Sequence, residues 1–328
     1  MPLSRRSLFA LDFSGRSRPA DGWVRIHRTA MACRFEITLA PADRAHVAAA
    51  RKALDESERL DRLLSTARQT SEVAHINRLA GREAVPASAE LFGLLQACVR
   101  ISADTEGTFD ITSRPLNRCW AHARMEGRQP VPGELAAARS SVGMHRVSLD
   151  LERSTVRLSS VAAAIGFGGI AKGHALDRMG DILRARDVVH ALVSAGGSSI
   201  LAIGGRDKGW QVDVRPALPA SGVRIRLRDG ALGTSGIGEQ FALVDGVHDG
   251  RVVDPRTGRP PRDVRSATVL ASTAAAADAL STAFLVGGPV LAGSYCASHG
   301  NTLAILTMND QASTIRTFGA FRGATLLQ

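Results

Sequence analysis

The chain has 328 residues, 45% of them hydrophobic, which is enough to bury a full core. Its formal net charge is +10 at pH 7, but its arginines are interleaved with acidic residues along the whole chain. A basic surface without a concentrated positive run disfavours nucleic acid as a partner and suits an anionic ligand. The four cysteines lie far apart and fit no metal-ligand spacing, so we expect buried thiols in a reducing compartment.

Residues 1–21 are predicted to form a flexible leader, and residues 22–328 a single domain. The leader has a twin-arginine-like start, Ser4 to Phe9, but the apolar run that follows is interrupted at Asp12. No segment is expected to reach the roughly 18 apolar residues that span a bilayer. These features predict a cytoplasmic protein without a membrane span.

The first half of the chain is predicted to contain a strand hairpin followed by helices. Alternating apolar residues predict the hairpin over 23–27 and 33–39, and amphipathic periodicity predicts a long helix over 42–64. The further elements expected are helices over 71–79 and 89–105, an extended segment around 108–112, a surface excursion over 121–140, and a hairpin of 146–149 with 155–159.

The second half is predicted to begin with a glycine-rich loop and a helix that ends near residue 186. The elements expected after it are a strand over 190–194, short strands over 200–253, a strand over 267–271, a helix over 273–286, another helix from Pro289, and a hairpin of 302–308 with 314–318. Strands and helices alternate irregularly, without repeated βαβ spacing. This pattern predicts an α+β fold with mixed, largely antiparallel sheets packed against helices.

The most distinctive segment runs from Gly166 to Asp177 and reads GFGGIAKGHALD. Four of its first eight residues are glycines, which let a backbone approach and wrap phosphate oxygens. Lys172 is one of only three lysines in a chain with 38 arginines, and its flexible ammonium suits a phosphate or ribose contact. The segment is therefore a candidate cofactor cradle.

The same glycines also match the dinucleotide-binding fingerprint, which is the main alternative. Gly166, Gly168 and Ala171 have its spacing, and Asp187 lies about 20 residues further on. The segment lies in the middle of the chain, however, and opens no βαβ repeat. A nicotinamide-dependent dehydrogenase stays an alternative on this evidence, and so does a tight turn onto a helix with no ligand.

A second candidate site lies on the alanine-rich helix near the C-terminus. Asp278 and Thr282 are four residues apart, so their side chains project from one helix face. A carboxylate and a hydroxyl are hard oxygen ligands of the kind that Mg²⁺ accepts. Spacing alone favours a simpler interpretation, an exposed acid with a threonine bonded to the preceding turn.

Eight segments of the sequence together resemble one family. They are Met31 to Cys33, Leu64 to Glu72 with Asn77, Gly107 to Thr112 with Trp120, Gly168 to Asp177, Ala195 to Gly197, Thr234 to Gly236, Asp254 to Gly258, and Ala277 to Ala283. Their content and order are similar to those of the ApbE-type FAD:protein FMN transferases, over about residues 23–320. A single motif of this length is weak evidence, whereas eight in the order of one family are specific.

The resemblance implies an ApbE-like fold and a particular chemistry. Enzymes of this family bind FAD and Mg²⁺, break the pyrophosphate, and pass FMN to a Thr or Ser hydroxyl of an acceptor flavoprotein. AMP is released. Mg²⁺ and a lysine would neutralise the charge that develops as the bridging bond breaks.

The positions of the motifs also imply which residues form the site. The metal ligands would be the backbone carbonyl of Gly169 with Asp278 and Thr282. The catalytic residues would be Asp278 and Lys172, with Arg251 at the position where the family has a histidine. The contacts to FAD would come from Met31, Thr108, Phe109, Asp110, Lys172, Asp177, Gly196, Gly197 and Val252.

Five positions depart from the family pattern, and they are Ala67, Gly166, Ser194, Ser198 and Arg251. Ala67 and Gly166 stand where the family has a tyrosine and an acid, and Arg251 replaces the histidine. An arginine cannot act as a base at neutral pH. Two alternatives to protein flavinylation therefore stay open: hydrolysis of FAD to FMN and AMP, and an FAD-binding homologue that no longer turns over.

Overall fold

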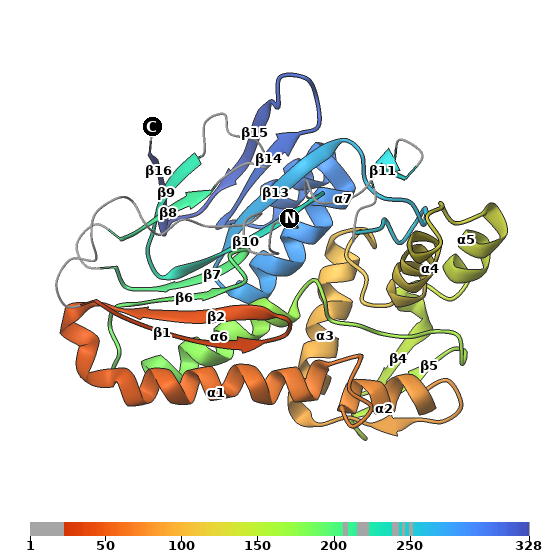
Figure 1. The fold of residues 1–328 in the computed structure, drawn as a ribbon, viewed down its shortest axis with the longest axis horizontal. Helices are drawn as coiled ribbons and strands as arrows, with labels where there is room; N and C mark the ends of the chain where they lie inside the picture. The colour runs from red at the N-terminus through yellow and green to blue at the C-terminus, as the bar shows by residue number, and fades with distance from the viewer. Residues whose placement is uncertain are drawn as a thin grey trace.

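A sheet of eight strands forms the centre of the computed structural model (Figure 1). The structure describes residues 23–205, 209–214, 223–237, 243–244, 247–248 and 252–327. In spatial order the strands are β1 (Val24–Ala30), β2 (Cys33–Leu39), β6 (Ala191–Ala195), β7 (Ser199–Ile203), β10 (Gly230–Gly236), β13 (Val264–Ala271), β14 (Thr302–Met308) and β15 (Ile315–Ala320). Every neighbouring pair is antiparallel, and the predicted α+β class is confirmed.

The first hairpin of the sheet is the one expected from the alternating apolar residues, and β1 extends further, to Ala30. Met31 and Ala32 make the turn with φ of 48° and 57°. Two successive positive φ values are typical of the two-residue turns whose twist matches a hairpin. The turn therefore presents Met31 at the end of the sheet.

Three helices cover one face of this sheet: α1 (Val47–Leu64), α6 (Ala171–Arg184) and α7 (Ala274–Ser298) (Figure 1). They share an apolar core with the inward-facing residues of β1, β2, β6 and β7. The first residues of the predicted helix over 42–64 belong instead to a 3-10 helix, Pro41–His46, and Pro41 lies in its first turn, where no amide hydrogen is needed. The helices of the N-terminal and C-terminal halves thus lie on the same side.

A smaller sheet packs on the opposite face and consists of β8 (Trp210–Val214), β9 (Val223–Leu227) and β16 (Ala324–Leu327). Its apolar residues meet alternate residues of the large sheet, including Leu232 and Ile305. Every residue of β6, β7 and β14 is buried because layers cover both faces. A further two-stranded pair is formed by β11 (Leu243–Val244) and β12 (Val247–His248).

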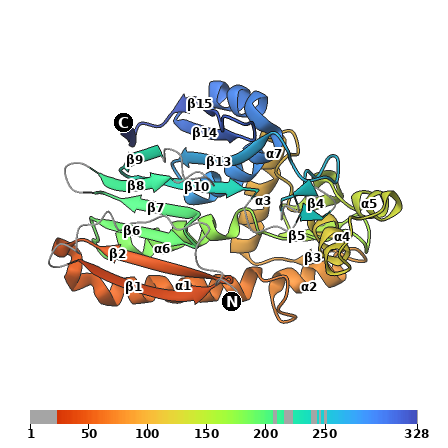
Figure 2. The same ribbon diagram turned by 45° about the horizontal axis from the view of Figure 1, so that its top comes forward.

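A third group of elements lies beyond one end of the large sheet (Figures 1 and 2). It contains α2 (Glu72–Leu79), α3 (Ala89–Asp104), α4 (Arg114–Met125), α5 (Pro132–Arg139), a 3-10 turn (Met144–Arg146), and the small sheet of β3 (Val85–Pro86), β4 (Val147–Asp150) and β5 (Thr155–Leu158). Two predictions are wrong here. Residues 108–112 form turns that lead into α4 rather than a strand, and the excursion over 121–140 consists mainly of α4 and α5. Pro132, one of the two prolines of that excursion, begins α5, in the first turn of which no amide hydrogen is needed.

The helix α7 combines the two helices expected near the C-terminus. Gly288 has non-helical dihedrals (φ 70°, ψ −164°), and the second segment begins at Pro289 as predicted. By length and composition α7 could cross a membrane, so the expectation that no segment is long and apolar enough is wrong. Most of the helix is buried against β10 and β13, which is the packing of a core helix.

The helices α6 and α7 close each other's N-terminal ends, an arrangement that we call the reciprocal cap. Asp177 of α6 accepts hydrogen bonds from the amides of Ala274 (2.7 Å) and Ala275 (2.9 Å) at the start of α7. Asp278 of α7 accepts one from the amide of Gly173 (2.8 Å) in the first turn of α6. These amides have no partner within their own helix, so each carboxylate stabilises the other helix.

Asp177→Asn should reveal a pH-dependent contribution to stability. Burial raises the pKa of Asp177 to about 6, even though two amides donate to it. The folded protein therefore holds this proton more tightly than the unfolded chain does. The stability of the wild type relative to Asp177→Asn should be largest below about pH 4 and fall by about 3 kcal/mol as the pH rises through about 6. Urea unfolding of both proteins across this range checks it, and a constant difference would contradict it.

Candidate active site

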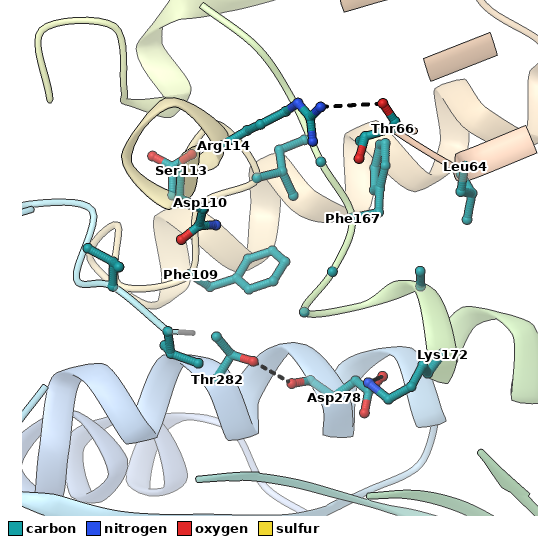
Figure 3. Close-up of a pocket in the computed structure, with 18 of the residues that line it drawn as sticks. Leu64, Thr66, Phe109, Asp110, Ser113, Arg114, Phe167, Lys172, Asp278 and Thr282 are labelled. Carbon is teal, nitrogen blue, oxygen red and sulfur yellow. Dashed lines mark hydrogen bonds and ion pairs between the residues drawn. The ribbon is translucent and has the colours of Figure 1, made fainter. Parts of the chain in front are cut away.

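One cavity of about 820 Å³ brings together most of the residues that the sequence singled out. It lies between the α6–α7 pair and the group of elements around α3 and α4 (Figure 3). Its volume is in the range of cofactor pockets. The sequence-predicted residues that line it are Met31, Thr108, Phe109, Asp110, Gly169, Lys172, Val252, Asp278 and Thr282.

Three of the described site residues that were predicted, Asp177, Gly196 and Gly197, are not among those that line this cavity. Asp177 belongs to the reciprocal cap and is hydrogen-bonded to α7. Gly196 and Gly197 form the turn between β6 and β7, where the Gly196 amide donates to the carbonyl of Arg34 (2.9 Å). Arg251 lies outside the described residues.

The glycine-rich loop is held in place by side chains from the other wall. The side-chain Nδ2 of Asn77 donates to the carbonyl of Ile165 (2.9 Å), and its Oδ1 accepts from the amide of Ile165 (2.7 Å). The amide of Gly166 donates to the carbonyl of Ile111 (2.8 Å). The preceding strand β5 belongs to another sheet than β6, and both sheets are antiparallel. No βαβ unit surrounds the loop, so the dinucleotide-fingerprint alternative is wrong.

The loop approaches the helix α7 at Gly169. A Cβ atom added to Gly169 would lie 3.2 Å from Thr282 Oγ1 and 3.4 Å from the ring of Phe109. Thr282 Oγ1 lies 3.1 Å from Ser235 Oγ and donates to the carbonyl of Asp278 (3.3 Å). The two candidate motifs therefore meet in one place, although 106 residues separate Lys172 from Asp278.

Both carboxylate oxygens of Asp278 have polar partners in the protein. Only 3% of it is exposed, so the interpretation as an exposed acid is wrong. Its Oδ1 accepts from Ser199 Oγ (2.5 Å), and its Oδ2 accepts from the Gly173 amide (2.8 Å) and lies 3.5 Å from Lys172 Nζ. Donors from α6 and β7 therefore fix the orientation of this carboxylate.

A turn from Thr108 to Thr112 forms the adjacent wall. The hydroxyl of Thr108 donates to the carbonyl of Thr105 (2.8 Å), while Phe109 is buried against the glycine-rich loop. Asp110 Oδ1 accepts from both the amide and the hydroxyl of Thr112, at 2.6 Å each. Burial raises the pKa of Asp110, whereas these hydrogen bonds and His145 oppose that shift. The turn is therefore rigidly connected before any ligand binds.

The helix α4 supplies a wall that the sequence analysis missed. Arg114, Asn117, Arg118 and Ala121 line the cavity from one helix face. On the opposite face Trp120 is buried, and its Nε1 donates to the carbonyl of Gly258 (2.8 Å). The spacing i, i+3, i+4, i+7 was the available signal, but no helix was predicted over residues 114–121.

Ser199 and Ser235 were also missed as supporting residues. If the cavity holds Mg²⁺, as the resemblance implies, Ser199→Ala should weaken Mg²⁺ binding because it removes the hydroxyl that donates to Asp278, and the Mg²⁺ concentration for half-maximal turnover should rise about tenfold. Titration of AMP release with Mg²⁺ measures this. The matched control is Ser198→Ala, the neighbouring residue on the turn, which should leave the titration unchanged.

The fold and the residues that line the cavity together indicate the class of protein. This is an α+β protein whose cavity places a buried carboxylate, hydroxyls and an ammonium beside a glycine-rich loop, a set of groups that suits a phosphorylated ligand. The profile of the ApbE family matches residues 31–306, most of the chain. The chain belongs to the ApbE family.

The relatives agree with this membership. The chain is 29% identical over 238 residues to a FAD:protein FMN transferase of Vibrio cholerae, and the aligned region covers 70% of this chain and 71% of the relative. It is 25% identical over 267 residues to the FAD:protein FMN transferase of Escherichia coli K12, with 79% and 76% covered.

Two solved structures share the fold. The ApbE protein of Thermotoga maritima has a TM-score of 0.81 at 28% identity, and the superposed region covers 90% of this chain and 97% of the Thermotoga chain. The flavin transferase ApbE of Vibrio cholerae has a TM-score of 0.78 at 23% identity, with 91% and 97% covered. The ApbE-like architecture expected from the motifs is confirmed.

Proposed function

We propose that this protein is a Mg²⁺-dependent transferase that moves FMN from FAD to a Thr or Ser hydroxyl of an acceptor flavoprotein and releases AMP. The coarser part, an enzyme of the flavin-transferase type, follows from membership of the family and from the names of its relatives. The observation that carries the finer part is the convergence of Gly169, Lys172, Asp278 and Thr282 on one cavity.

The residues at this point suit Mg²⁺. Asp278, Thr282 and the Gly169 carbonyl would hold it, and a side chain at 169 would crowd the threonine hydroxyl at 3.2 Å. Among the described residues, no group of three or more His, Cys, Asp or Glu residues could hold a metal. One carboxylate with neutral oxygens suits a cation that keeps waters and substrate phosphate as its other ligands. When bound, Mg²⁺ would neutralise charge on the pyrophosphate.

The chain's own residues would position and polarise the substrate. Lys172 places an ammonium beside Asp278, where a pyrophosphate oxygen would meet it. In the transfer, the acceptor hydroxyl oxygen forms a bond to the phosphorus on the FMN side, and the bond from that phosphorus to the bridging oxygen breaks. AMP leaves with the electron pair, and the hydroxyl proton is released. Phe109 is buried against the loop at this end of the cavity.

The deciding experiment incubates the full chain with FAD, Mg²⁺ and a candidate flavoprotein. AMP is quantified by chromatography, and covalent flavin is followed by its fluorescence on a denaturing gel. Labelled acceptor with equimolar AMP supports transfer. AMP without label supports FAD hydrolysis, and bound FAD without either product would refute both enzymatic functions.

The location of the protein is part of the proposal. The four cysteines are all unpaired, two of them buried, as expected for a protein of a reducing compartment such as the cytoplasm. Cell fractionation with an antibody to the chain tests this, and recovery outside the cytoplasm would refute it.

A further inference from the structure

A second cavity, of about 430 Å³, lies beside β9 and β16. Its lining comes from these two strands and from the segments that join β9 to β10, β13 to α7, α7 to β14, and β15 to β16. The strand β9 lies at the opposite end of the molecule from α4, which lines the first cavity (Figures 1 and 2). Among the described residues, none lines both cavities. We call the second cavity the basic pocket.

Three arginines from different segments meet in the basic pocket. Arg226 comes from β9, Arg228 from the turn after it, and Arg322 from the turn before β16. All three are exposed, and Arg226 and Arg322 form no ion pair with another described residue. Arg228 Nε lies 3.9 Å from an oxygen of Asp229, the one acid in the described lining. Three guanidinium groups and one carboxylate give this lining a net charge of +2.

Hydrogen bonds between neighbouring segments hold the backbone of the basic pocket. The amide of Arg228 donates to the carbonyl of Gly323 (2.8 Å). The amide of Arg322 donates to Oδ1 of Asn301 (2.8 Å), and Nδ2 of Asn301 donates to Ser272 Oγ (3.2 Å). A Cβ added to Gly323 would lie 2.2 Å from the carbonyl oxygen of Arg228, so the two turns are in close contact. The positions from which Arg228 and Arg322 extend are therefore fixed without a ligand.

The pairing of β9 with β16 fixes the third arginine. Arg226 lies directly opposite Thr325 in the antiparallel register, so the two side chains are on the same face of the strand pair. Both residues are exposed, whereas Ile225 and Leu227 are buried on the other face. The guanidinium of Arg226 and the hydroxyl of Thr325 therefore face the basic pocket together.

The charge of the basic pocket and its number of donors suit a phosphomonoester. Such a group carries a charge of about −1.5 to −2 at pH 7 and three acceptor oxygens. Guanidinium groups bind phosphate through pairs of parallel hydrogen bonds. A carboxylate has a single charge and two oxygens, so it would leave part of the positive charge without a partner. The volume of the pocket is at the lower end of the range of small-ligand sites.

We propose that the basic pocket binds the dianionic phosphate of a phosphomonoester, carried by a soluble molecule or by a lipid headgroup. Arg226, Arg228 and Arg322 would neutralise its charge, and Thr325 would donate a hydrogen bond. The pocket is distinct from the cavity proposed for FAD, so this inference does not depend on flavin transfer. The protein would then hold two phosphorylated ligands at once, one at each end.

Isothermal titration calorimetry of the full chain with glycerol 3-phosphate tests the proposal. Arg226→Gln/Arg322→Gln should bind this monoester about tenfold more weakly than the wild type. Dimethyl phosphate, a diester with one charge, should bind the wild type about tenfold more weakly than the monoester does. The control is Arg157→Gln/Arg186→Gln, which loses the same two charges at exposed positions outside both cavities and should bind the monoester as the wild type does. Circular dichroism verifies that each variant is folded.

Sedimentation with phosphatidylcholine vesicles, with and without phosphatidic acid, distinguishes the two sources of the phosphate. Binding to the vesicles with phosphatidic acid that Arg226→Gln/Arg322→Gln loses would indicate a lipid headgroup. Binding of glycerol 3-phosphate without binding to vesicles would indicate a soluble ligand. Failure of the wild type to bind glycerol 3-phosphate would overturn the proposal, as would equal binding by the wild type and Arg226→Gln/Arg322→Gln. An equal loss in Arg157→Gln/Arg186→Gln would also overturn it, because the attraction would then depend only on the net charge of the protein.

Discussion

Asp278→Asn is expected to release AMP from FAD about 10³-fold more slowly than the wild type at saturating Mg²⁺, equivalent to about 4 kcal/mol of transition-state stabilisation. The amide has nearly the shape of the carboxylate and one oxygen that accepts from the Gly173 amide. It lacks the negative charge that a hard cation requires from its only carboxylate ligand. Rates are compared over a Mg²⁺ titration, so that weaker binding is separated from slower turnover.

The control for this charge change is Asp187→Asn. Asp187 is exposed and has a φ of 58°, a conformation that asparagine also adopts readily. It is also the acid that a dinucleotide fingerprint would use for a ribose contact. AMP release by this variant should equal that of the wild type. Unchanged turnover in Asp278→Asn would refute the assignment of Asp278 as metal ligand.

Gly173→Ala is expected to cost about 3 kcal/mol or more of folding free energy. The added Cβ would lie 2.0 Å from the carbonyl oxygen of Ala274, a backbone atom that cannot move without shifting α7. The same shift would break the hydrogen bond from the Gly173 amide to Asp278. Urea unfolding followed by far-ultraviolet circular dichroism measures the loss, and the surviving folded fraction should also show a higher Mg²⁺ requirement.

Gly168→Ala is the matched control in the same segment. A Cβ at position 168 would meet no atom within 4 Å. Its stability should therefore stay within about 0.5 kcal/mol of the wild type. Equal stability of the two variants would show that α6 and α7 do not pack as closely as the structure indicates.

Most strands of the large sheet and most helices that pack on it were predicted, because the periodicity of their apolar residues is a local property of the sequence. The hairpin of β1 and β2 and the helix α3 follow directly from alternation and amphipathic spacing. The failures lie at α4 and α5, where prolines and glycines suggested loops although they mark helix boundaries. Local composition alone does not distinguish a proline that begins a helix from one in a loop.

The site was predictable only in part, for a different reason. Asp278 and Thr282 were singled out because they share one helix face, but only the family resemblance made them candidate metal ligands, and Lys172 was singled out by its glycine neighbours. Ser199 and Arg114 were missed, since their roles depend on where β7 and α4 lie relative to α6 and α7. Asp177 was assigned to the cofactor from its motif, whereas its carboxylate is occupied by the amides of α7.

The reciprocal cap has a consequence for how the protein opens. The N-terminal amides of each helix donate to a carboxylate of the other helix. Fraying of either helix therefore leaves buried polar groups without partners in both. The two helices therefore form a single cooperative unfolding unit. Because Asp278 belongs to the cap and to the cavity, partial opening of this unit would also displace the carboxylate that we propose as a metal ligand. Folding of these two helices and assembly of the proposed metal site would therefore occur together.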